Sequence, residues 1–106
     1  MYLYKFSKQA DGDIEKSYDY YESKQNQLGK EFVQEVFNSI KSFENKPEKN
    51  PADSDGIRKA KLKKFPFYIY YVFQSPMVLI IAIWHIARLP FSSKDRLDTG
   101  EWLKYK

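Results

Sequence analysis

Cysteine is absent from this 106-residue chain, and its absence removes two kinds of site. Without thiols the chain can form neither disulfide bonds nor thiolate zinc centres. We also expect no metal site of another kind and no cofactor. A cysteine-free composition fits a cytoplasmic protein, and the first residues, MYLYKF, lack the basic region and apolar run of a signal peptide, so we do not expect export.

A hydrophobic run long enough to cross a bilayer is also lacking. The apolar stretch at residues 77–86 is only about ten residues long, roughly half of what a membrane-spanning helix needs. It is rich in β-branched residues, so it predicts a core strand and no membrane contact. The sequence has no internal repeat and no low-complexity segment, and its length predicts one domain.

Acidic residues are missing from one long stretch. Residues 57–88 contain six lysines or arginines and no aspartate or glutamate, whereas residues 8–46 contain eight acids and six bases. The formal net charge of +4 is therefore unevenly distributed along the chain. A domain polarised in this way favours a polyanionic partner, either a nucleic acid or an acidic protein segment.

The acid-free stretch contains a predicted β-hairpin. Two β-rich runs, residues 67–73 and 78–86, flank the sequence QSPM, whose proline suits a turn and not a central strand. Alternation places large side chains on both faces of the first run, so we expect both faces to be covered. One face would carry Phe67, Ile69, Tyr71 and Phe73, and the other Tyr68, Tyr70 and Val72.

The N-terminal half predicts a short strand followed by two helices. Residues 2–6 alternate as a strand, and Ser7 is a candidate N-cap for the helix that follows. A second periodic apolar set predicts another helix from about residue 27 to residue 45. The short polar connection between the two helices implies an antiparallel pair.

A surface loop and a basic strand connect the helices to the hairpin. Pro47 ends the second helix, and the polar residues that follow predict a loop reaching Gly56. Residues 57–64 alternate, which places Lys59, Lys61 and Lys63 in a row on one face, about 7 Å apart. A row of this kind can equally be a solvated strand edge that resists unwanted pairing.

The predicted fold is a two-layer α+β domain. An N-terminal strand and an antiparallel helix pair would pack on a small, mostly antiparallel sheet, whose other face stays open. We expect this domain to span residues 1–90. Residues 91–106 would form a tail packed on or near it, with Trp102 as the main anchor.

The order of these elements resembles the RelE/ParE family of bacterial type II toxin–antitoxin modules. The resemblance covers roughly residues 2–90 and rests on the Tyr20-Tyr21 pair, the basic strand, the sequence FPFYIYY from residue 65 and the ending HIARLP from residue 85. It implies a growth-inhibiting toxin that acts either on translation, through ribosome-dependent mRNA cleavage, or on DNA gyrase. It also implies an acidic, disordered antitoxin as partner and a toxin–antitoxin hetero-oligomer.

For the ribonuclease branch, the resemblance implies a metal-independent endoribonuclease. Such cleavage needs cations and an acid or base around the scissile phosphate. Lys59, Lys61 and Lys63 match the family's basic strand, and Arg88 matches its arginine after the last strand. Two positions depart from the ribonuclease pattern, because Tyr68 stands where an arginine is expected and Lys94 where a tyrosine is expected.

His85 is the remaining candidate catalytic residue. Histidine is a common general acid or base, so His85 could supply the missing group, or it could simply bond a neighbouring backbone group. Tyr68 and Tyr70 are either packing residues or platforms for stacked bases. The alternative from a different class of protein is a degenerate module without catalysis, which only pairs with an antitoxin or binds nucleic acid.

Overall fold

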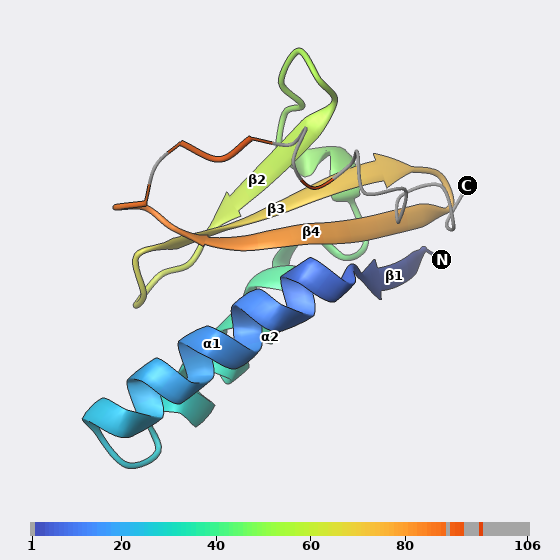
Figure 1. The fold of residues 1–106 in the computed structure, drawn as a ribbon. Coiled ribbons are helices and arrows are strands. Elements are labelled where there is room, and N and C mark those ends of the chain that lie inside the picture. The colour runs from blue at the N-terminus through green and yellow to red at the C-terminus, as the bar shows by residue number, and fades with distance from the viewer. Residues whose placement is uncertain (1, 89, 93–95, 97–106) are drawn as a thin grey trace.

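The computed structural model describes residues 2–88, 90–92 and 96. Two helices lie on one face of a four-stranded sheet, which confirms the predicted two-layer α+β fold (Figure 1). The strand order is β1-β4-β3-β2, and only the β1–β4 pair is parallel. The elements are β1 (Leu3–Phe6), α1 (Lys8–Lys24), α2 (Leu28–Phe43), the 3-10 helix η1 (Pro47–Lys49), β2 (Ile57–Lys61), β3 (Phe67–Gln74) and β4 (Met77–His85).

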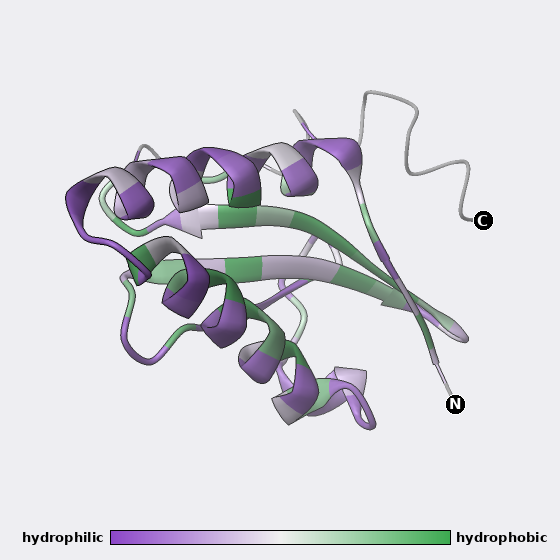
Figure 2. Cartoon of the chain, turned by 90° about the horizontal axis from the view of Figure 1, so that it is seen from below, coloured by the Kyte–Doolittle hydropathy of each residue, from purple (hydrophilic) through white to green (hydrophobic). Residues whose placement is uncertain are grey.

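Both helices form where the sequence predicts them. The Ser7 hydroxyl accepts a hydrogen bond from the Ala10 amide at 3.1 Å, which confirms Ser7 as the N-cap of α1. The apolar stripe of α2 is turned toward the sheet, whereas α1 is more polar along its length (Figure 2). The buried residues of α2 are Gly29, Phe32, Val36, Ile40 and Phe43.

A carboxylate closes the tight connection between the helices. Gln27 has a positive φ of 76° and no side-chain cap bond, so the first amides of α2 need another acceptor. Glu22 supplies it, because its two carboxylate oxygens accept hydrogen bonds from the amides of Gln27 and Gly29, each at 3.0 Å. The antiparallel helix pair follows from this short reversal.

The basic strand is shorter than the sequence predicts. β2 ends at Lys61, and the chain then turns, so the predicted strand over residues 57–64 is too long at its C-terminal end. The cause is Glu35 of α2, whose carboxylate accepts the amides of Lys64 at 2.7 Å and Phe65 at 3.2 Å. Those two amides are bound by α2 instead of a neighbouring strand.

The hairpin of β3 and β4 is confirmed, with one irregularity that the alternation pattern does not reveal. Tyr70 lies opposite Ala82 and Tyr71 opposite Ile80, so Ile81 is the extra residue of a β-bulge. Ile80 packs in the core under the helices, while Ile81 packs in a second cluster on the other face. The bulge therefore shifts the alternation for the rest of β4.

Apolar clusters cover both faces of the sheet, as predicted. The cluster under the helices includes Phe67, Ile69 and Tyr71, with Phe73 packed against it. The smaller cluster on the other face is joined by Phe91. None of the helices in the described part of the chain combines the length and apolar composition needed to cross a bilayer.

The helix crossing at Gly29 yields a first prediction. A Cβ added there would lie 2.7 Å from the carbonyl oxygen of Tyr18, so we expect Gly29→Ala to lower the free energy of unfolding by about 1–3 kcal/mol. Gly12→Ala is the matched control, because nothing lies within 4 Å of its added Cβ, and it should stabilise α1 by about 0.5–1 kcal/mol. Urea unfolding followed by circular dichroism measures both, and stabilisation by both variants would contradict a tight crossing.

Tyr4 yields a prediction about alkaline pH. Its hydroxyl donates to the carbonyl oxygen of Phe43 at 3.2 Å, and burial, followed by the nearby Tyr71 and Glu44, raises its pKa from 10.0 to about 12. A raised pKa means that the unfolded chain releases this proton first, so the stability that Tyr4 contributes is present below pH 10 and lost between pH 10 and about 12.

We expect Tyr4→Phe to lose less stability than the native chain across that pH window, because phenylalanine has no proton to release. Urea unfolding at intervals across the window measures the difference. Parallel losses in the two proteins would show that other groups, which both share, cause the alkaline loss.

Candidate functional site

Two of the predicted lysines lie on the face of the sheet opposite the helices, which we call the open face. Lys59 and Lys61 of β2 are exposed and lie opposite Tyr70 and Tyr68 of β3. The Lys59 ammonium is 4.6 Å from the centroid of the Tyr68 ring. The ring quadrupole attracts a cation at that distance, so β2 and β3 together present positive charge over aromatic surface.

Arg88 reaches the same face from the turn that follows β4. Its guanidinium carbon lies 3.6 Å from the centroid of the Trp84 ring. Trp84 is opposite Tyr68 across the β3–β4 pair, and directly paired residues share a face of the sheet. No carboxylate forms an ion pair with Arg88 within residues 2–88, 90–92 and 96. Arg88 therefore lies at the end of the sheet, where its guanidinium covers Trp84 beside the open face and its amide donates to the carbonyl oxygen of His85 at 3.1 Å.

An aromatic cluster forms the floor between these cations. Phe91 stacks on Tyr70 with ring centroids 4.2 Å apart and meets the Trp84 ring edge-on at 5.3 Å. The Tyr68 and Tyr70 rings lie 6.0 Å apart. Burial, followed by the charges of Tyr68 and Asp53, raises the pKa of Tyr70. Its phenol therefore stays protonated at neutral pH.

Lys63 does not continue the row of lysines that the sequence predicts on the open face. It follows the end of β2 and lines a groove of about 650 Å³ that runs beside α2. Lys61 and Lys64 line the same groove, together with the carboxylates of Glu31 and Glu35. The positive charge at Lys63 therefore faces a mixed polar surface that includes acids.

His85 lies on the helix side of the sheet, across from Lys59 and Lys61. It is opposite Phe67, a residue of the core under the helices, and the two rings meet edge-on with centroids 5.0 Å apart. Its Nδ1 accepts a hydrogen bond from the Ala87 amide at 2.9 Å. The sheet itself separates this imidazole from Lys59 and Lys61.

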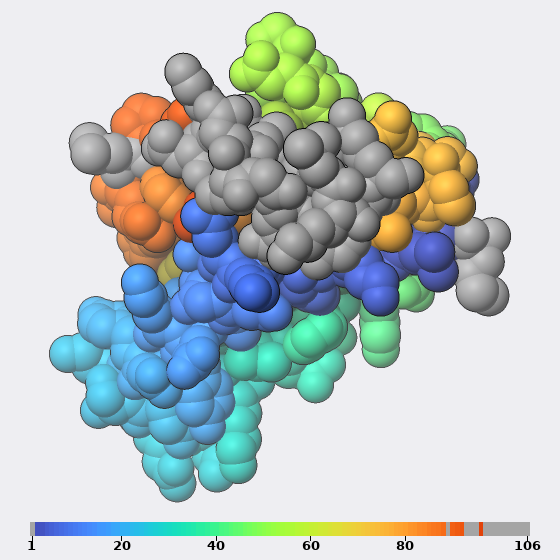
Figure 3. All heavy atoms as spheres, turned by 45° about the vertical axis from the view of Figure 1, so that its right-hand side comes forward, coloured from blue at the N-terminus to red at the C-terminus, as the bar shows by residue number. Residues whose placement is uncertain are grey.

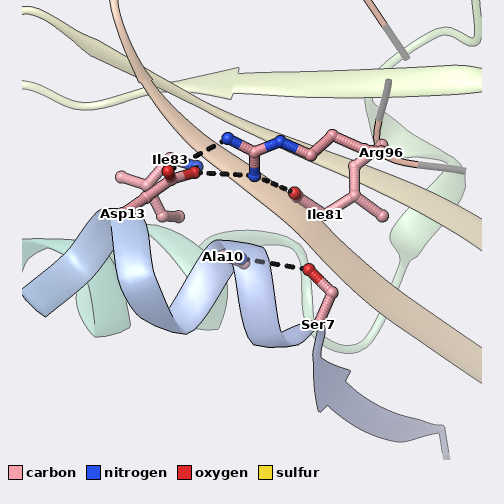
Figure 4. A network of polar contacts seen from close by, with 6 residues as sticks. All are labelled: Ser7, Ala10, Asp13, Ile81, Ile83 and Arg96. Carbon is pink, nitrogen blue, oxygen red and sulfur yellow. Dashed lines mark hydrogen bonds and ion pairs between the residues drawn. The ribbon is translucent and has the colours of Figure 1, made fainter. Parts of the chain in front are cut away.

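The structure also contains a polar network that our sequence analysis missed. Arg96 donates to both carboxylate oxygens of Asp13 at 3.0 Å and to the carbonyl oxygen of Ile81 at 2.8 Å (Figure 4). The Ile83 amide donates to the same carboxylate at 3.0 Å. The two ionic side chains are only 10% and 11% exposed. Asp13 and Arg96 are 83 residues apart, so no local pattern relates them.

These positions define what the open face can do chemically. It offers cations and aromatic rings, which suits the binding of an anionic or aromatic surface.

No group of three or more His, Cys, Asp or Glu side chains in the described part of the chain is arranged to hold a metal ion. The expected tyrosine position, Lys94, and the predicted anchor Trp102 both lie outside the described residues.

The fold and the site together define a class of protein. Its members are small α+β domains with two lysines on an edge strand and a sheet face of cations and aromatic rings. A sequence model of the family described as "ParE toxin of type II toxin-antitoxin system, parDE" matches residues 4–90. The chain therefore belongs to the ParE toxin family, which confirms the resemblance in the sequence.

Comparison with solved structures supports the same fold. A chain of the "Chromosomal ParDE TA system from P. aeruginosa" superposes with a TM-score of 0.72 at 20% sequence identity. The match covers 81% of this chain and 97% of the other. No curated protein sequence matches this chain significantly.

The Asp13–Arg96 pair yields a prediction about stability. We expect Asp13→Ala to lower the free energy of unfolding by about 2–4 kcal/mol, because it leaves the nearly buried guanidinium and the Ile83 amide without their acceptor. Glu15→Ala, which removes an exposed carboxylate from the same helix, should change stability by less than about 0.5 kcal/mol. Thermal and urea unfolding compare the two, and equal small losses would show that the pair contributes little.

Proposed function

We propose that this ParE-family toxin arrests bacterial growth by binding DNA gyrase, and that it does not cut RNA. The observation that carries the proposal is the position of His85 on the helix side of the sheet, away from Lys59 and Lys61. Metal-independent RNA cleavage needs a base for the 2′-hydroxyl and an acid for the leaving oxygen, both close to the cations that stabilise the phosphate.

The groups on the open face do not meet that requirement. Burial raises the pKa of Tyr70, which favours the protonated phenol and makes this side chain a poorer base. Tyr68 stands where the ribonuclease branch would carry an arginine. The remaining groups are cations and aromatic rings, which bind a partner surface well and are typical of interface hot spots.

Membership of the ParE family favours the gyrase branch over the ribonuclease branch. Growth inhibition through gyrase requires surface recognition and no covalent chemistry by the toxin. Trp84 under Arg88 and Tyr68 under Lys59 form two cation–aromatic pairs suited to that recognition. Because gyrase acts on DNA inside the cell, we place the active toxin in the cytoplasm.

The second candidate function is ribosome-dependent mRNA cleavage. It is favoured by the cations on and beside the open face, because positive charge beside stacked aromatic rings also suits single-stranded RNA. We propose that a cognate acidic antitoxin holds the toxin inactive under either function. The acid-free basic stretch at residues 57–88 is suited to an acidic, disordered segment that folds on binding.

Induced expression in bacteria should arrest growth and block DNA supercoiling while transcripts on ribosomes stay intact. We expect Arg88→Ala to weaken inhibition of purified gyrase about tenfold or more, because a central arginine of an interface commonly contributes that much. Lys41→Ala on α2 is the control, since it removes an exposed charge away from the open face.

Co-expression of the small protein encoded beside the toxin gene should restore growth. If transcripts are cut and DNA supercoiling stays normal, the gyrase function is wrong and ribosome-dependent mRNA cleavage is the function. Normal growth at verified expression would instead indicate the degenerate binding module.

A further inference from the structure

A cleft lies on the helix side of the sheet, between α1 and the C-terminal end of β4. Its volume is about 530 Å³. One wall is a single face of α1, formed by Asp13, Lys16, Ser17 and Tyr20 at helical spacing. His85 and other residues at the end of β4 form the opposite wall. Figure 3 shows the orange end of β4 directly above the blue α1, with the α1–α2 hairpin projecting below.

The charges in this cleft do not balance. Asp13 is the one carboxylate among the described lining residues, and Arg96 and the Ile83 amide already occupy its oxygens. Lys16 and Arg88 also line the cleft, and neither has an ion-pair partner in the described part of the chain. The cleft therefore carries two positive charges that no acid of the described chain neutralises.

The neutral groups of the cleft are mostly hydrogen-bond donors. Since Nδ1 of His85 accepts the Ala87 amide, the neutral imidazole carries its proton on Nε2, which can donate. The hydroxyls of Ser17 and Tyr20 line the same cleft. Phe67 is 5% exposed and forms an apolar floor, which lowers the local dielectric and strengthens a charged hydrogen bond.

We propose that this cleft receives a carboxylate side chain, aspartate or glutamate, from an extended acidic peptide segment of the antitoxin. Cations and donors that line one cleft above an apolar floor suit a carboxylate with a short apolar stem. The cluster of Tyr68, Tyr70 and Phe91 rings lies on the opposite, open face, but Tyr20 and Tyr21 line the cleft as well, so a single-stranded oligonucleotide is the competing ligand in the test. The inference rests on the antitoxin partner of the proposed function and assigns one part of its binding site.

The test uses the full-length toxin and a fluorescein-labelled peptide of about ten glutamates, followed by anisotropy. We expect Lys16→Gln to weaken binding about two- to fivefold, as for an exposed ion pair. Ser17→Glu should weaken it more than tenfold, because it places a negative charge inside the cleft. Lys41→Gln removes the same charge from the far end of α2 and should bind like the native chain. Circular dichroism confirms that each variant is folded.

Three results would overturn the proposal. The first is equal binding by the native chain and the Ser17→Glu variant. The second is a loss on Lys59→Gln as large as the loss on Lys16→Gln, which would place the peptide on the open face. The third is binding of a decathymidine oligonucleotide, and not of the peptide, with sensitivity to Lys16→Gln, which would make the cleft a phosphate site. Gyrase inhibition is measured separately, so failure of the gyrase function leaves this test intact.

Discussion

The carboxylate of Asp13 is the contact on which the arrangement of the two layers depends. β1 pairs with β4 from Met77 to Ile80, and no other strand of the described residues lies beside the rest of that β4 edge. Asp13 accepts the Ile83 amide of that edge, and Arg96 donates to the carbonyl oxygen of Ile81. Two side chains therefore continue the pairing that the short β1 leaves unfinished. They also fix α1 against β4, which aligns Lys16, Ser17 and Tyr20 with the end of the strand.

The bulge at Ile81 decides which chemistry each face of the sheet receives. One extra residue in β4 places Trp84 on the open face and His85 on the helix side. If the same sequence ran through Ile81 in regular alternation, with no bulge, the imidazole would lie on the same face as Lys59. The separation of Lys59 and Lys61 from the imidazole thus follows from the bulged pairing at Ile81.

Local patterns predicted most of the fold, because its elements are specified locally. The Ser7 cap, the two helical stripes and the proline turn of the hairpin all lie within a few residues of what they control. The features that the sequence did not reveal are contacts over long separations. Glu35 ends β2 from 29 residues away, and Arg96 reaches Asp13 across 83 residues. The site prediction was limited for the same reason, since the bulge and the end of β2 determine where His85 and Lys63 lie.

The basic stretch of the sequence does not fold into one basic patch. Arg58 donates to the carbonyl oxygens of Glu48 and Asn50 and so holds the loop, while Lys63 and Lys64 line the groove beside α2. Lys59 lies on the open face, and Arg88 lies at the end of the sheet between that face and the cleft. A compact acidic surface could neutralise only one of these places. An extended acidic chain that wraps the domain can reach the groove, the open face and the cleft together, which is the binding mode that disordered segments permit. The distribution of cations over three surfaces thus favours a long, flexible partner over a globular one.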